Sequence, residues 1–157
     1  MQNQTANDYF RMILVTVVGQ AFAAAGYTLE ERPMQWAGGM FRFVKTLQAE
    51  VYAFIEFQAL TYVDSEWSSG QPSRFRITLI RSDSPAAAPG KAPAAARRTL
   101  SALVVEDFGV TILPSADHWW TFKDTESLGR ALAEAGHLIV GYGIPWLAGE
   151  LLPPQSS

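Results

Sequence analysis

The chain has 157 residues, about the length of one domain, and it can bury roughly two-thirds of its unfolded surface. Hydrophobic residues make up 48% and charged residues 17%, a composition that excludes a disordered chain kept open by charge. The net charge of -3 argues against a general nucleic-acid binder, which needs a concentrated positive face. Cysteine is absent, so disulfides, thiolate metal sites and cysteine nucleophiles are excluded. We expect a single domain over residues 1–157, with a short flexible tail at 153–157.

An apolar run from Met12 to Val18, followed by small residues at Ala21 to Ala25, allows two interpretations. A secretory signal peptide needs a clearly positive start, whereas the stretch before the run carries one base, Arg11, and one acid, Asp8. On a helical wheel most of the apolar residues fall on one arc, which favours an amphipathic core helix that ends at Gly26. The run is also too short to span a bilayer. We therefore expect a core helix, no cleaved leader, no membrane partner and a cytoplasmic location.

Further along the chain the hydrophobic period changes from 3.6 to 2, which is typical of strands. Three strands are predicted, at Met40 to Leu47, Val51 to Val63 and Phe75 to Leu79, with apolar residues at odd-numbered positions. The short connections through 48–50 and 64–73 suit antiparallel hairpins. The sequence thus predicts an α+β fold, in which helices cover one face of a mainly antiparallel sheet of about four to five strands.

The stretch from Ser84 to Arg98 alternates alanine triplets with prolines and offers no large apolar residue to bury. Because proline blocks helix propagation, we expect a surface loop over 84–98. A disordered docking segment is the functional alternative. Lys91, Arg97 and Arg98 form a small basic cluster that could touch an acidic partner.

The residues after this loop predict a short helix and a pair of strands. The helix is capped by Thr99 and stops at Gly109. The strands, Val110 to Leu113 and Trp119 to Phe122, are expected to pair with each other through a turn at 114–117. This hairpin would add to the sheet.

The end of the chain predicts two further helical segments. Asp124 is a plausible N-cap for a helix that ends at Gly136 or runs on through Val140. Gly141-Tyr142-Gly143 lacks the third glycine and the long helix of a dinucleotide-binding loop, so it predicts a turn. One last helical turn follows, with Pro145 at its first position.

Aromatic segments recur along the predicted elements. After the N-terminal helix come Phe54-Ile55-Glu56-Phe57-Gln58, Phe75-Arg76-Ile77-Thr78-Leu79, Trp119-Trp120-Thr121-Phe122 and Pro145-Trp146-Leu147. Over roughly Asn7 to Leu151 this pattern resembles the bacterial family catalogued as domain of unknown function 4304. The resemblance implies an α+β fold and an uncharacterised role, and it supplies no catalytic residues. The Ala/Pro-rich insertion at Ser84 to Arg98 departs from what the family leads us to expect.

Polar side chains alternate with the apolar ones along the predicted strands, so they would share the sheet face away from the helices. If the strands pair in order, this face carries Arg42, Tyr52, Glu56, Gln58, Arg74 and Arg76. The arginines could bind an anionic ligand through bidentate hydrogen bonds. The alternative, which we favour, is a set of cross-strand ion pairs on a solvated face. A slip of one residue in the register would move every side chain to the other face.

A second candidate site is the run of Asp117 and His118 beside Trp119 and Trp120, a potential acid/base group with aromatic walls. Adjacent strand residues point to opposite faces, so Asp117 need not orient His118. A turn aspartate and a surface or capping histidine are the simpler interpretation. His137, near a helix end, is expected to have a structural role. Two histidines without cysteine argue against zinc, and we expect no metal and no cofactor.

Motifs of known catalytic classes are absent, including GxSxG, GxxxxGK[ST], GxGxxG and HExxH. Their absence favours a non-catalytic module that binds a small ligand or a protein, and a homodimer is compatible with this role. One alternative is a small metal-independent enzyme that uses Glu56 or His118 as acid/base and Arg42 or Arg76 as anion clamps. Another is an immunity-type or accessory partner protein. The candidate ligand-binding residues are Arg42, Tyr52, Glu56, Gln58, Arg76, His118, Trp119 and Trp120.

Overall fold

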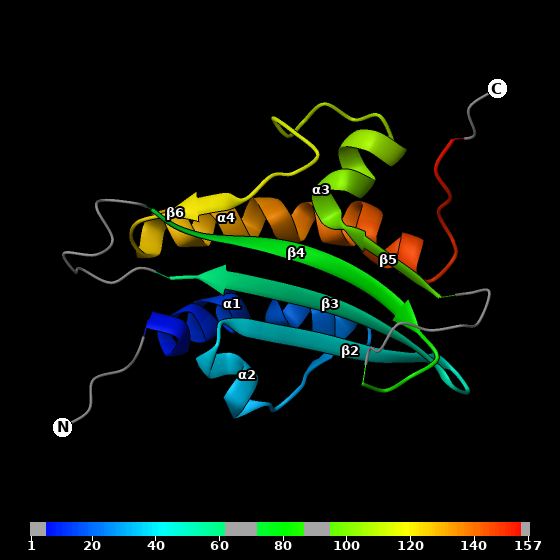
Figure 1. Ribbon diagram of the computed structural model, residues 1–157, viewed down its shortest axis with the longest axis horizontal. Helices are drawn as coiled ribbons and strands as arrows, with labels where there is room; N and C mark the ends of the chain where they lie inside the picture. Colours follow the sequence, from blue (N-terminus) through cyan, green and yellow to red (C-terminus); the bar gives the residue numbers. More distant parts are fainter. Residues whose placement is uncertain (1–5, 62–71, 87–94, 155–157) are drawn as a thin grey trace.

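The computed structural model describes residues 6–61, 72–86 and 95–154 of the chain. In chain order its elements are α1 (Ala6–Ala24), β1 (Thr28–Leu29), α2 (Pro33–Ala37), β2 (Met40–Gln48), β3 (Val51–Leu60), β4 (Ser73–Ser82), β5 (Ala96–Thr99), α3 (Leu100–Ala102), η1 (Leu103–Asp107), β6 (Trp120–Phe122), α4 (Thr125–Leu138), η2 (Ile139–Gly143) and α5 (Ile144–Leu147). The η elements are short π-helical stretches that continue α3 and α4. The predicted α+β fold is confirmed, and α1 and α4 lie behind β2, β3 and β4 (Figure 1).

The sheet is antiparallel in each described pairing and has the order β1-β2-β3-β4-β5, with β6 also paired to β4. The three long strands therefore pair in sequence order, as predicted. Their apolar odd-numbered residues face the helices and are at most 3% exposed at Phe43, Ile55 and Ile77. The predicted end of the second strand, at Val63, lies outside the described residues.

The helix α1 buries one side chain per turn, at Phe10, Leu14, Val18 and Phe22. This spacing of four residues keeps the buried side chains on one stripe of the helix. The helix ends where Gly26 adopts a φ of 95°, a left-handed conformation that glycine enters without strain. The predicted core helix and its stop are confirmed.

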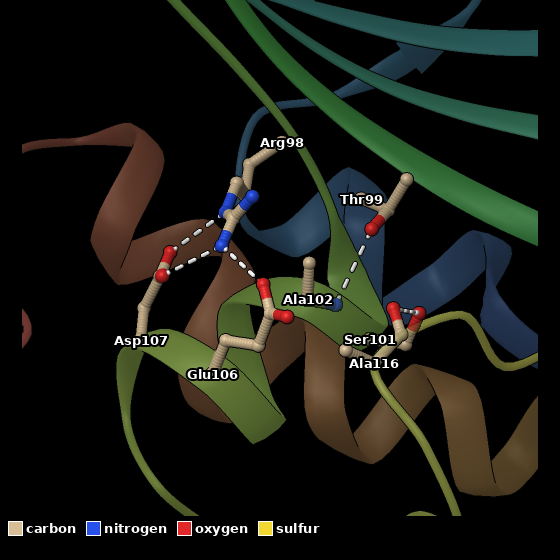
Figure 2. Close-up of polar contacts among 7 residues, drawn as sticks. All are labelled: Arg98, Thr99, Ser101, Ala102, Glu106, Asp107 and Ala116. Carbon is tan, nitrogen blue, oxygen red and sulfur yellow. Dashed lines mark hydrogen bonds and ion pairs between the residues drawn. The ribbon is translucent and has the colours of Figure 1, made fainter.

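The edge of the sheet beyond β4 is built from two separate pieces of chain. Thr99 of β5 lies opposite Thr78, and Trp120 of β6 lies opposite Phe75, so both pieces run along the same side of β4. The chain between them, residues 100–119, leaves the sheet and returns to it. Ser101 holds the base of this excursion: its hydroxyl donates to the Ala116 carbonyl at 2.9 Å (Figure 2) and accepts the backbone N–H of His118 at 3.2 Å.

This arrangement corrects the predicted hairpin of Val110 to Leu113 with Trp119 to Phe122. Residues 110–113 form no strand, and Trp120–Phe122 pairs with β4 instead. The Val110 N–H bonds to the carbonyl of Val104 at 3.0 Å, which holds the start of the segment against η1. Ile112 is 62% exposed, so the segment does not bury the apolar face that a strand of this sheet would present.

The predicted loop over 84–98 also needs correction at its end, because Ala96–Thr99 forms β5. The strand has no large apolar side chain, and it is held by backbone pairing with β4 and by Arg98. The Arg98 guanidinium donates to both carboxylate oxygens of Asp107, at 2.9 and 2.8 Å, and to Glu106 at 2.8 Å (Figure 2). Thr99 accepts the N–H of Ala102 at 3.2 Å, so the predicted helix cap is confirmed. Residues 87–94 of the predicted loop lie outside the described part of the chain.

The helix α4 starts at the predicted cap. Asp124 accepts the N–H of Ser127 at 2.8 Å, and the Ser127 hydroxyl accepts the Asp124 N–H at 3.1 Å. The helix does not end at Gly136 but continues through η2, so Gly141-Tyr142-Gly143 is helical rather than the predicted turn. A Cβ on Gly143 would lie 3.2 Å from Leu79, so the absence of a side chain lets η2 approach β4 closely. Pro145 stands in the first turn of α5, as predicted.

Candidate functional site

Polar side chains of the central strands gather on the sheet face opposite α1 and α4, which we name the open face. Arg42 lies opposite Glu56, and Glu56 lies opposite Thr78. In the neighbouring row of the same face, Gln58 lies opposite Arg76. Residues directly opposite each other in a sheet point to the same side. The predicted placement of these side chains on one face is therefore confirmed.

Arg42 lies between two carboxylates of the open face. Its Nη1 atom is 3.6 Å from Glu30 Oε1, and its Nη2 atom is 3.2 Å from Glu56 Oε2. Arg97 Nη2 approaches the other oxygen of Glu56 to 3.9 Å. The side chains of Arg42, Glu30 and Glu56 are 12%, 12% and 8% exposed, so these charges are held out of water and paired with each other. Arg42 and Glu56 therefore form the cross-strand ion pair that we favoured, rather than an anion clamp and a free base. The predicted solvated face is wrong at this pair, because Phe54, Glu56 and Thr78 of the same face are at most 8% exposed.

Two other arginines of the open face have different surroundings. The Cζ atoms of Arg74 and Arg76 lie 4.6 and 4.8 Å from the centre of the Trp119 ring. Arg76 Nε donates to Gln58 Oε1 at 3.2 Å, whereas Arg74 Nε is shielded from water without a hydrogen-bond partner. Among the residues that the structure describes, no carboxylate comes within 4.0 Å of either guanidinium. We name Arg74, Arg76 and Trp119 the Trp119 cluster.

Trp119 and Trp120 lie on opposite faces of the sheet. Trp120 pairs with Phe75 and Thr121 pairs with Arg74, so strand alternation brings Trp120 to the core and Trp119 to the open face. Trp120 is 4% exposed, and its ring stacks on Phe75 with centres 5.6 Å apart. Of the two tryptophans that the sequence places together, only Trp119 belongs to the open face.

His118 lies on the helix side of the sheet, next to Trp120. The two rings meet edge to face with centres 4.7 Å apart, and Trp120 Nε1 donates to Glu134 Oε1 at 2.9 Å. These side chains line a depression of about 360 Å³ between β6 and α4. Asp117 is exposed. Because Glu56 points to the open face, the structure does not bring His118 and Glu56 into one site.

The environment of His118 makes the folded protein sensitive to pH. Burial lowers the pKa of His118 from its ordinary value, and the nearby Glu134 carboxylate opposes part of this change. The neutral ring therefore stabilises the fold above the unfolded pKa of about 6.5, and this contribution is lost as the pH falls through the lower pKa of the folded state. We expect the free energy of unfolding to fall more between about pH 7 and pH 5 in the wild type than in His118→Gln.

Urea denaturation at both pH values measures this difference. His137→Gln, at an exposed position in the last turn of α4, is the matched control and is expected to keep the wild-type dependence. An equal pH dependence in wild type and His118→Gln would contradict the prediction. The structural role expected for His137 at a helix end is not supported, because the helix continues beyond it through η2 and α5.

Tyr52 lies on the open face but far from the Trp119 cluster. It stands six positions before Gln58 in β3, and a strand advances about 3.3 Å per residue, so about 20 Å separates the two residues. A small ligand held by the Trp119 cluster therefore cannot reach Tyr52.

The predicted basic cluster is divided between the two faces of the sheet. Arg97 approaches Glu56 on the open face, and Arg98 binds Asp107 on the helix side. Lys91 lies outside the described residues. Since adjacent residues of a strand point to opposite faces, Arg97 and Arg98 cannot act together on one acidic group.

No family model, no curated protein and no solved structure matches the chain. The resemblance to the family of unknown function 4304 therefore stays a prediction. Within residues 6–61, 72–86 and 95–154, no helix combines the length and the apolar character needed to cross a bilayer.

Proposed function

We propose that the protein is a non-catalytic binding module whose Trp119 cluster holds an anionic group of a ligand or of a protein partner. The observation that carries this proposal is that Arg74 and Arg76 share the Trp119 ring, with no carboxylate beside either guanidinium in the described part of the chain. Two neighbouring like charges repel each other, and the negative face of an indole offsets only part of this repulsion. A bound anion would offset the rest.

Arg42 provides an internal comparison on the same face of the sheet. Its charge is neutralised by Glu30 and Glu56, whereas the arginines of the Trp119 cluster contact an aromatic ring and an amide. Arg76 Nε is bonded to Gln58 and Arg74 Nε is shielded, so the Nη groups of the two guanidiniums, which have no hydrogen-bond acceptor among the described residues, are the ones available to an external acceptor. This contrast supports Arg76, together with Arg74, as an anion clamp, and it does not support Arg42 in that role.

The same geometry weighs against the enzyme alternative. That alternative uses Glu56 or His118 as acid/base, but Glu56 is engaged by Arg42 and His118 lies on the other face of the sheet from Arg76. An immunity-type or accessory role fits the proposal when the anionic group belongs to a protein. A cytoplasmic location, a homodimer and membership of family 4304 stay predictions from the sequence.

The proposal predicts that anions bind at Trp119 and that the arginines are required. Titration with citrate or inorganic phosphate is expected to shift the indole N–H signal of Trp119 in nitrogen-15 NMR spectra, where Trp119→Phe identifies that signal among those of the five tryptophans. Hydrogen bonds to charged groups contribute about 1.5–3 kcal/mol, so Arg74→Ala or Arg76→Ala is expected to weaken binding about tenfold or more.

Arg130→Ala is the matched control for the loss of one positive charge. Arg130 lies on α4, is 71% exposed and pairs with Glu126. It borders the depression between β6 and α4 that Trp119 also lines, whereas neither Arg74 nor Arg76 lines that depression. We expect the control to bind citrate as the wild type does. An equal loss in all three variants would show a general charge effect, and an unshifted Trp119 signal would contradict the proposal.

A further inference from the structure

We infer that the anionic group held by the Trp119 cluster belongs to an extended acidic peptide segment that carries two carboxylate side chains two residues apart. This inference rests on the proposed function and names the chemistry of the partner. Two observations carry it: the spacing of Arg74 and Arg76 along β4, and the arrangement of charges around them.

The spacing follows from strand geometry. Arg74 and Arg76 are alternate residues of β4, so both point to the open face, with about 7 Å between their Cα atoms. In an extended peptide laid along this face, side chains at positions i and i+2 also point to one side with the same separation of about 7 Å. Each guanidinium can then bind one carboxylate through two parallel hydrogen bonds.

The residues next to Arg76 on the open face limit the number of peptide carboxylates that can bind there to two. The next residue of β4 on this face is Thr78, which is 8% exposed and lies opposite Glu56. The cations near that row, Arg42 and Arg97, are already engaged by Glu56. A third carboxylate beside Thr78 would therefore face another carboxylate and find no unpaired cation.

A nucleic acid is a poorer match to this surface than a peptide. It carries a charge on every nucleotide, so it is bound by longer runs of unpaired cations. The chain has 15 acidic against 12 basic residues, and on the open face Arg42 and Arg97 are paired with acids. A peptide needs only two charges here, and tryptophan and arginine are residues enriched at the energetic centres of protein interfaces.

Three synthetic peptides of equal length, composition and net charge test the inference. Each contains two glutamates. They stand at positions i and i+2 in the first peptide, at i and i+1 in the second, and at i and i+3 in the third. Only the first arrangement places both carboxylates on one side of an extended chain. We expect it to bind about fivefold more tightly than the other two, as measured by the NMR shift of the Trp119 indole signal.

Variants connect this preference to the two arginines. In Arg74→Ala and in Arg76→Ala the three peptides are expected to bind equally. One remaining guanidinium can bind only one glutamate, so the distance to the second glutamate no longer affects the affinity. Arg76→Lys, which keeps the charge and the side-chain stem, is expected to fold and to lose most of the preference, because an ammonium group lacks the bidentate fork. Arg130→Ala is expected to retain the full preference.

The outcomes separate this inference from the proposed function. If all three peptides shift the Trp119 signal with equal affinity, the spacing inference is overturned, while anion binding at the cluster stands. If neither the peptides nor citrate shift it, both fail. If a single-stranded oligonucleotide binds the cluster more tightly than the best peptide at physiological salt, the partner is a nucleic acid and the peptide inference is overturned.

Discussion

Replacing Phe75 by alanine is expected to lower the free energy of unfolding by about 3–5 kcal/mol, the range for large aromatic residues removed from cores. Phe75 is fully buried and packs against aromatic side chains from one helix, α1, and from two other strands of the sheet, β3 and β6. Its ring lies within 6.3 Å of four other rings, those of Phe10, Phe57, Trp120 and Phe122. The cavity left by alanine would therefore loosen α1, β3 and β6 together.

Urea denaturation measures the loss, and Phe75→Leu separates volume from aromatic packing. Leucine keeps much of the volume, so we expect it to cost about 1–2 kcal/mol. Met34→Ala, at a side chain that is 88% exposed, is the surface control and is expected to stay within about 0.5 kcal/mol of wild type. A loss below about 1.5 kcal/mol for Phe75→Ala would show that the core collapses around the gap.

Gly39→Ala is expected to cost about 3 kcal/mol or more, because two penalties add at this position. Gly39 has a φ of 87°, in the left-handed region that disfavours a side chain. A Cβ placed there would overlap the backbone carbonyl oxygen of Ala59, which cannot move aside as a flexible side chain would. The Gly39 carbonyl also accepts the Ala59 N–H at 2.7 Å, so the overlap disturbs the start of the β2–β3 pairing.

Gly109→Ala separates the two penalties. Gly109 has a φ of 69°, and no neighbouring atom lies within 4 Å of an added Cβ, so only the conformational penalty of about 1–2 kcal/mol is expected there. Thermal and urea unfolding of both variants measure the difference. Equal losses in the two variants would show that the contact with Ala59 relaxes without cost.

Features that depend on a few neighbouring residues could be predicted from the sequence. The stripe of buried residues from Phe10 to Phe22 follows from helical periodicity, and the caps at Thr99 and Asp124 follow from side chains that accept the backbone N–H three residues ahead. The alternation in β3 likewise placed Glu56 and Gln58 on the face where they are found. In each case the cause lies within one turn of helix or one stretch of strand.

The composition of the candidate site could be predicted only in part. Arg76 and Trp119 are both among the predicted ligand-binding residues, but nothing in the sequence shows that their strands, β4 and β6, lie side by side. Glu30 was missed as the partner of Arg42, because it follows a strand of two residues that no periodicity reveals. The hairpin at 110–113 was predicted wrongly because the sequence does not show that Trp120–Phe122 pairs with β4.

The sequence alone determined the fold class, the central antiparallel strands and the polar character of one sheet face, because these follow from hydrophobic periods and short connections. Tertiary structure decided which charges on that face are neutralised. Arg42 meets Glu30 and Glu56, while Arg74 and Arg76 meet Trp119, from a segment that returns to the sheet after the excursion of residues 100–119. Contacts of this kind join residues far apart in the chain, so they depend on strand partners and register that no local pattern encodes.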